Sequence, residues 1–208
     1  MTGHAAVVDG EGVAKERVEA LLRAVPPRDR ETRPESLARA ERQRRRWATQ
    51  VVVTDELAHR ACADRGLKPP AELSPAQVLA VAGSDVADLG SIVAAALAHS
   101  PAARVLLDRL EHEQDVPEAA VRDYYERNRD RFLTPEALRR GADPFGGAAR
   151  EDFLPYEDVR AGIGRELRRA AGRRAFFDWL DQARAGVVYA HGYEHPGDPS
   201  HPDHEHRH

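Results

Sequence analysis

Apolar residues in the last third of the chain recur at the spacing of a helix. Between positions 156 and 184 they follow at steps of three, four and seven residues: Val159, Ile163, Leu167, Ala170, Phe177 and Leu180, with Phe176 and Trp179 beside them. This period places them on one stripe of a long helix, and arginines fill most of the remaining circumference. The pattern predicts a helix from Tyr156 to about Arg184, and its length of about 40 Å requires packing partners along it.

The first half of the chain is expected to supply those partners. Residues 5–9 predict a short strand, residues 10–12 a turn, and Val13 leads into a helix that Pro26 ends. A second helix is predicted from Ser36 to about Arg65, with Gly66 as its carboxyl cap. The predicted core positions of this second helix are Leu37, Trp47, Val51, Leu57 and Ala61.

Serine and proline mark the starts of further helices. Ser74-Pro75 and Ser100-Pro101 each place a capping hydroxyl before a proline at the first helical position. The alanine-rich segment 85–99 is apolar on several faces and predicts a buried central helix. Pro117 opens an amphipathic helix, in which the residues expected to pack are Val121, Tyr124 and Tyr125.

The remaining segments complete a mainly helical fold. Residues 133–152 are rich in glycine and charge and predict a long surface loop with one helical turn at PEALRR. Residues 187–189 form a short β-prone run. We therefore expect a single mainly α domain over residues 1–189, followed by a histidine-rich tail over residues 190–208.

Composition limits the surroundings and the chemistry. The formal net charge of −4 argues against general nucleic-acid affinity, although the basic run 39–47 is either a solvated helix face or a contact for an anionic partner. No segment approaches the ~20 apolar residues of a membrane span, and the amino terminus lacks a signal-peptide pattern. We therefore expect a cytoplasmic protein without membrane contact. The single cysteine, Cys62, excludes an internal disulfide, and its place in a predicted helix favours a buried thiol over a nucleophile.

Four stretches, in their order and spacing, resemble the parvulin-type foldases, the SurA and PrsA group of chaperones and peptidyl-prolyl isomerases. AAVVDGEGVAKERVEALL is similar to the opening strand, "VNGE" turn and first helix of that group, and RRRWATQVVVTDELAHRACADRGL to its long helix ending in "A…RG". VPEAAVRDYYERNRDRF matches the run V-x-E-x-V-x-x-Y-Y-x-x-N-x-x-x-F, after which the isomerase domain begins. The segment 153–189 resembles the final "F-x-x-V-x-x-I" helix and the returning strand of the group.

The chain departs from this group where the isomerase domain would stand. Residues 133–152 leave twenty positions for a domain of many tens of residues, so no prolyl isomerase activity is expected. The resemblance then implies a helical module like the amino-terminal domain of SurA, which the carboxyl-terminal helix completes. It also implies a small two-strand pairing of residues 187–189 with residues 5–8. These foldases are exported, unlike the cytoplasmic protein expected here.

Six of the ten histidines lie in the last eighteen residues: His191, His195, His201, His204, His206 and His208. Acidic residues alternate with them, and imidazole with carboxylate suits zinc, nickel, copper or iron. Two interpretations stay open. The tail is either a histidine-rich end that binds metal loosely, or an ordered site in which Gly192-Tyr193 and Pro196-Gly197 turn the chain back onto a surface. If the two ends of the chain pair, His4 can approach His191 and add a ligand.

Other candidate chemistry is sparse. Tyr124-Tyr125-Glu126 and Asp178-Trp179 can line a cleft between helices, although packing or a solvated face is the simpler interpretation of both. His59, His99 and His112 fall in or beside predicted helices, where an ordinary core or surface histidine is the simpler interpretation. Phosphate-binding glycine motifs and the nucleophile elbow are absent from the sequence, which argues against nucleotide cofactors and serine hydrolase chemistry.

Two functions from different classes follow. The first is a cytoplasmic, chaperone-like binding protein with an apolar groove between helices that holds a peptide, a partner protein or a small hydrophobic ligand. The alternative is a metal-dependent enzyme of small-molecule biosynthesis, in which the histidine tail folds over that groove and holds a divalent transition metal. A metal carrier or store is a third interpretation of the same tail.

Overall fold

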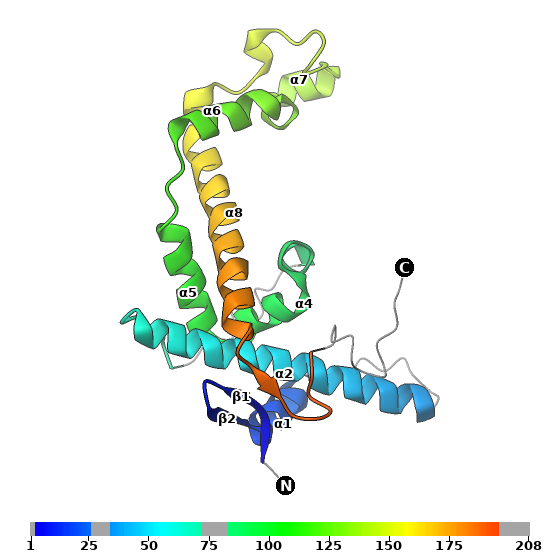
Figure 1. Cartoon of the computed structure of the whole chain (residues 1–208). Helices are drawn as coiled ribbons and strands as arrows, with labels where there is room; N and C mark the ends of the chain where they lie inside the picture. Colours follow the sequence, from blue (N-terminus) through cyan, green and yellow to red (C-terminus); the bar gives the residue numbers. More distant parts are fainter. Residues whose placement is uncertain (1–2, 26–33, 72–82, 196–208) are drawn as a thin grey trace. The chain divides into compact units, whose positions relative to one another are not determined.

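The computed structural model describes residues 3–25, 34–71 and 83–195. The chain is mainly helical (Figure 1), and its elements are β1 (His4–Val8), β2 (Glu11–Ala14), α1 (Lys15–Ala24), α2 (Pro34–Asp64), α4 (Gly83–His99), α5 (Pro101–His112), α6 (Glu118–Arg127), η1 (Arg129–Phe132), α7 (Pro135–Arg140), η2 (Arg150–Asp152), α8 (Tyr156–Arg184) and β3 (Val188–Tyr189). The helix predicted from Pro75 lies outside the described residues. None of the helices in the described ranges is long and apolar enough to cross a membrane.

Contacts divide the chain into two compact units. Met1–Leu106 and Phe177–His208 form the first unit, and Leu107–Phe176 forms the second. The helices α5 and α8 each contribute residues to both units. The division into a domain over residues 1–189 and a tail over residues 190–208 stays a prediction.

A small antiparallel sheet in the first unit has the strand order β2-β1-β3. Asp9 and Gly10 join β1 to β2 with positive φ angles of 51° and 85°, the backbone of a tight hairpin loop that Asp-Gly favours. The predicted turn at residues 10–12, with a helix starting near Val13, was therefore wrong, because residues 11–14 pair with β1. β3 pairs with β1, Val7 opposite Val188. This confirms the predicted pairing of the terminal segments, in a sheet of three strands instead of two.

The middle of α2 is the core of the first unit. Residues 48–54 are all buried, and β1, α1 and α4 each contact this helix. Burial on every side explains how the β-branched run 51–53 stays helical despite its weak propensity. Thr49 and Thr54 satisfy their hydroxyls within the helix, by donating to the carbonyls four residues earlier at 2.9 and 2.8 Å. The prediction of Leu37 as a core position was wrong, because this residue is 44% exposed. Trp47, another predicted core position, is half-buried.

Two predicted helix ends in this unit are confirmed. Gly66 has a φ of 65°, and the backbone N–H groups of residues 66 and 67 donate to carbonyls of the last turn of α2. The hydroxyl of Ser100 accepts from the N–H of Ala103 at 2.9 Å and so caps α5. The central helix predicted over residues 85–99 is part of α4, but it is not continuous, because Gly90 breaks it with φ 74° and ψ 157°.

In the second unit α6 and the first half of α8 enclose a hydrophobic cluster. Val121, Phe132 and Ile163 are its buried members, and aromatic rings including Tyr124 and Tyr125 pack against it, as predicted. The predicted surface loop 133–152 contains α7 at the predicted PEALRR turn. Backbone bonds also close this segment at its base, where Thr134 donates to the carbonyl of Asp152 at 2.7 Å.

The bounds of α8 match the predicted helix. Its apolar stripe is less regular than predicted: Ile163, Phe176 and Leu180 are buried, whereas Ala170 is exposed. Gly172 is the buried position between them. A β-carbon at Gly172 would lie 2.7 Å from the Cα of Glu111, so α5 passes directly against the backbone of α8 at this point.

Candidate functional site

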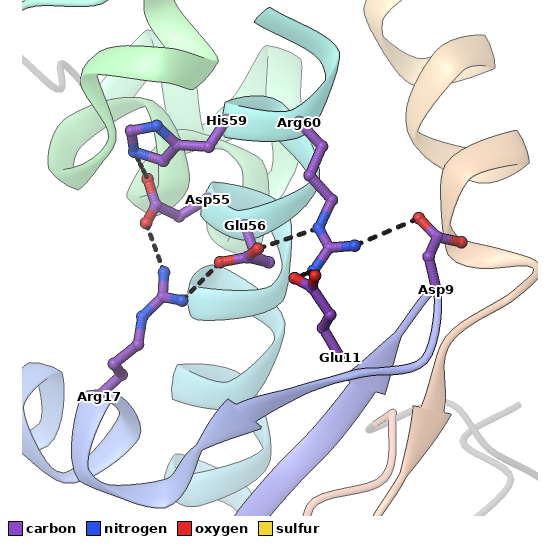
Figure 2. Close-up of polar contacts among 7 residues, drawn as sticks. All are labelled: Asp9, Glu11, Arg17, Asp55, Glu56, His59 and Arg60. Atoms are coloured by element: carbon purple, nitrogen blue, oxygen red, sulfur yellow. Dashed lines mark hydrogen bonds and ion pairs between the residues drawn. The ribbon is translucent and has the colours of Figure 1, made fainter. Parts of the chain in front are cut away.

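Seven charged or titratable side chains meet where α2 faces the β1–β2 hairpin and α1, as Figure 2 shows. They are Asp9, Glu11, Arg17, Asp55, Glu56, His59 and Arg60. Arg60 donates to Glu11 at 2.9 Å and to Glu56 at 3.0 Å, and its Nη1 lies 3.6 Å from Asp9. Arg17 donates to Asp55 at 2.9 Å and to Glu56 at 2.6 Å. The two guanidinium groups thus join three elements.

The shared member of this network is Glu56. Burial by itself raises the pKa of Glu56, but hydrogen bonds from Arg17 and Arg60 outweigh burial and leave the pKa below its ordinary value. Within the described ranges, no three His, Cys, Asp or Glu residues are arranged to hold a metal ion. The hydrogen bonds of Arg17 and Arg60 tie the hairpin and α1 to α2.

A hollow of about 1010 Å³ lies in the second unit beside α6, and we call it the α6 groove. Part of its lining comes from α6 and from Arg129 at the start of η1, and most of the rest comes from the segment 150–157. The lining residues are Arg122, Tyr125, Glu126, Arg129, Thr134, Arg150, Glu151, Phe153, Pro155, Tyr156 and Glu157. Every one of them belongs to the second unit.

Aromatic rings line the α6 groove and are held in place by polar bonds. The hydroxyl of Tyr125 donates to the carbonyl of Leu154 at 2.7 Å. The guanidinium of Arg122 lies 4.4 Å from the ring centre of Tyr156, and that of Arg129 lies 5.1 Å from the ring centre of Phe153. The groove therefore combines an apolar surface with cationic groups already placed over it.

Charges of both signs surround the rings of the α6 groove. Three arginines and three glutamates are among its lining residues, so the groove has no large net charge. The hydroxyl of Tyr156 donates to Glu118. Desolvation raises the pKa of Tyr156, and this hydrogen bond raises it further. Such a surface can hold apolar side chains and pair with charged groups of either sign beside them.

A second, smaller hollow of about 350 Å³ lies in the first unit between α1, α2 and the junction of α4 with α5. Its walls are mainly small apolar side chains such as Ala20, Ala24 and Val52, with Arg17 and His99 among the polar ones. Partial desolvation of its imidazole lowers the pKa of His99. The volume suits a small ligand better than a polypeptide segment.

The structure places only two of the predicted metal-binding histidines. His191 is exposed in the turn after β3, and His195 is half-buried. His201, His204, His206 and His208 lie outside the described residues, so a metal site in the tail stays a prediction. Extending the register of the β1–β3 pair places His4 opposite His191, but the chain turns at this point, because Tyr193 donates to the carbonyl of Ala190 at 3.0 Å.

The other sequence candidates separate into packing residues and groove residues. Tyr125 and Glu126 line the α6 groove, whereas Tyr124 packs on Phe132 at 6.4 Å between ring centres. Asp178 is exposed and Trp179 half-buried, and neither lines the two hollows described above.

Cys62 is buried, as predicted, and its Sγ lies 3.4 Å from the carbonyl oxygen of Ala102. Burial raises the pKa of this thiol, which disfavours the nucleophilic thiolate.

The basic run 39–47 is only partly a solvated face. Arg46 is 2% exposed, and Arg44 donates to the carbonyls of Leu22 and Val25 at the end of α1. The burial of Arg46 was not predicted from the sequence, because consecutive arginines give no sign of which one is buried.

Comparisons with models of protein families, with curated proteins and with solved structures found no match to this chain. The resemblance to the parvulin-type foldases therefore stays an expectation drawn from the sequence motifs.

Proposed function

We propose that this protein is a cytoplasmic, chaperone-like binding protein and that its α6 groove holds an extended segment of a peptide or a partner protein. The observation that carries the proposal is the groove itself: about 1010 Å³, at the upper end of the range for small-molecule sites, and lined by rings with charges of both signs around them. Foldase-like sequence motifs support the same kind of occupant.

The chemistry of the lining favours binding without covalent catalysis. Apart from the tyrosines, Thr134 is the one lining residue with a hydroxyl group. This hydroxyl accepts a hydrogen bond from the N–H of Ala137 at 3.2 Å. Neither cysteine nor histidine is among the lining residues. In contrast, the half-buried ring of Tyr156 offers apolar contact, and the arginines beside the rings of Phe153 and Tyr156 add cation–π and ion-pair contacts.

Binding of unfolded protein tests the proposal. The double variant Arg122→Ala/Arg129→Ala removes the two guanidinium groups over the rings. Both side chains are exposed, so the fold is expected to persist. We expect the double variant to bind a fluorescent, permanently unfolded protein such as reduced α-lactalbumin about tenfold more weakly, a change of about 1.4 kcal/mol.

A matched control lies on the same helix. Arg127 is exposed, pairs with Asp123 at 2.9 Å and does not line the α6 groove. Arg127→Ala is expected to leave the affinity unchanged. The proposal is wrong if both variants lose affinity equally, which would indicate a general charge effect, or if the double variant binds as the wild type does.

A further inference from the structure

Buried polar side chains follow one face of α2 in the first unit. Arg46, Gln50 and Thr54 are four residues apart, so they succeed one another along that face. Their exposed fractions are 2%, 0% and 0%. The end of α8 and the segment after it supply the groups that face this row, which are Arg184, Tyr189 and Glu194.

Two oxygen acceptors of the row, Gln50 Oε1 and Thr54 Oγ1, are already engaged. The hydroxyl of Tyr189 donates to Gln50 Oε1 at 3.1 Å. Arg184 Nη2 donates to Thr54 Oγ1 at 3.2 Å, and this hydroxyl in turn donates to the carbonyl of Gln50. The other buried oxygen beside the row is Glu194 Oε2, which is one oxygen for several donors.

Four buried N–H-bearing atoms of the row have no hydrogen-bond partner: Arg46 Nε, Arg46 Nη2, Gln50 Nε2 and Arg184 Nε. A buried donor left in this state costs about 1–3 kcal/mol, and a charged donor costs more. Glu194 Oε2 lies 3.8 Å from Arg46 Nε, close enough for charge attraction but too far for a hydrogen bond. Its other oxygen accepts from the N–H of Gly192 at 2.8 Å.

Two of these atoms, Nε and Nη2, belong to the guanidinium group of Arg46. Nε–H and Nη2–H point the same way from the planar guanidinium and form the fork that grips two oxygens of one carboxylate or phosphate. With Arg184 close by, the row also has more positive than negative charge. We propose that Arg46, supported by Gln50 and Arg184, binds a small oxyanion, a carboxylate or phosphate group. This site belongs to the first unit and is separate from the α6 groove.

Thermal unfolding with inorganic phosphate, and separately with acetate, tests this proposal on the full chain, against sodium chloride at equal ionic strength. For the wild type we expect a higher unfolding midpoint in at least one of the two oxyanions than in chloride. Arg46→Gln removes the fork and is expected to abolish that difference. Arg65→Gln is the matched control, because Arg65 is exposed at the end of the same helix, and it should behave as the wild type.

Glu194→Gln separates the oxyanion site from a simple internal Arg46–Glu194 pair. Glu194 competes with an added anion for the guanidinium, so its neutralisation is expected to increase the apparent oxyanion affinity several-fold. The proposal is overturned if neither oxyanion exceeds chloride, or if the difference persists in Arg46→Gln. If Arg46→Gln does not fold, an unchanged or weaker oxyanion response in Glu194→Gln overturns it instead.

Discussion

Replacing Gly172 by alanine tests how closely α5 and α8 approach each other in the second unit. A β-carbon at this position would lie 2.4 Å from Cγ, 2.7 Å from Cα and 3.0 Å from Cβ of Glu111. The Cα is backbone and cannot rotate away, so the two helices must shift. Overpacking of this kind costs about 1–3 kcal/mol, partly offset by the roughly 0.5–1 kcal/mol that alanine gains over glycine inside a helix. Taking the middle of each range, we expect the free energy of unfolding to fall by about 1 kcal/mol.

The same substitution two turns earlier is the matched control. A β-carbon at Gly164 would come no closer than 4.0 Å to Val121 Cγ2, so Gly164→Ala keeps the gain in helix propensity and is expected to stabilise the protein by about 0.5–1 kcal/mol. Urea unfolding followed by far-UV circular dichroism measures both. With a slope of about 2 kcal/mol/M, Gly172→Ala lowers the midpoint by about 0.5 M. A midpoint at or above that of the wild type would refute the close approach.

Three further predictions concern the ion-pair network, the thiol and the tail. Because the pKa of Glu56 is lowered in the folded protein, its carboxylate stabilises the fold at neutral pH, and this contribution is lost as the pH falls below the ordinary value of 4.5. Glu56→Gln should therefore lower the unfolding midpoint at neutral pH and have little effect in acid; an equal loss at both pH values would contradict the reasoning. Cys62 should not react with a disulfide reagent until the protein unfolds, and rapid labelling of the native chain would show that Sγ is accessible. If the tail histidines hold a metal, the untagged full chain should retain about one tightly bound ion per chain, detected by mass spectrometry, and a chain that ends at Tyr189 should retain none; equal metal content in both would exclude the tail.

Sequence patterns predicted the bounds of the long helix α8 and the start of α5. The apolar steps of three and four gave α8 its bounds, and the serine-proline pair at residue 100 placed the start of α5. β2 was missed because residues 11–14 have little strand propensity of their own and become a strand only through pairing with β1. The Asp-Gly pair at residues 9–10 was the available signal, since this dipeptide favours a two-residue hairpin loop.

The sites depend on contacts that a linear pattern does not contain. Tyr125 and Glu126 were candidates for a cleft between helices, but the sequence does not show that residues 150–157, at the end of the predicted loop and the start of α8, line the same groove. Burial of Arg46 depends on where the segment after β3, which carries Glu194, passes α2. Gly172 likewise has its role only because α5 touches α8 there.

Site-specific photo-crosslinking tests the central claim, peptide binding in the α6 groove, most directly. Glu157 lines the groove and is exposed, so a benzoylphenylalanine in its place faces any bound segment. The matched probe stands at Arg127, on α6 but outside the groove lining. After irradiation with reduced α-lactalbumin, we expect crosslinks from position 157 and few from position 127, and an excess of an unlabelled competing peptide should remove them. Equal crosslinking from both positions, or none from position 157, would contradict the account.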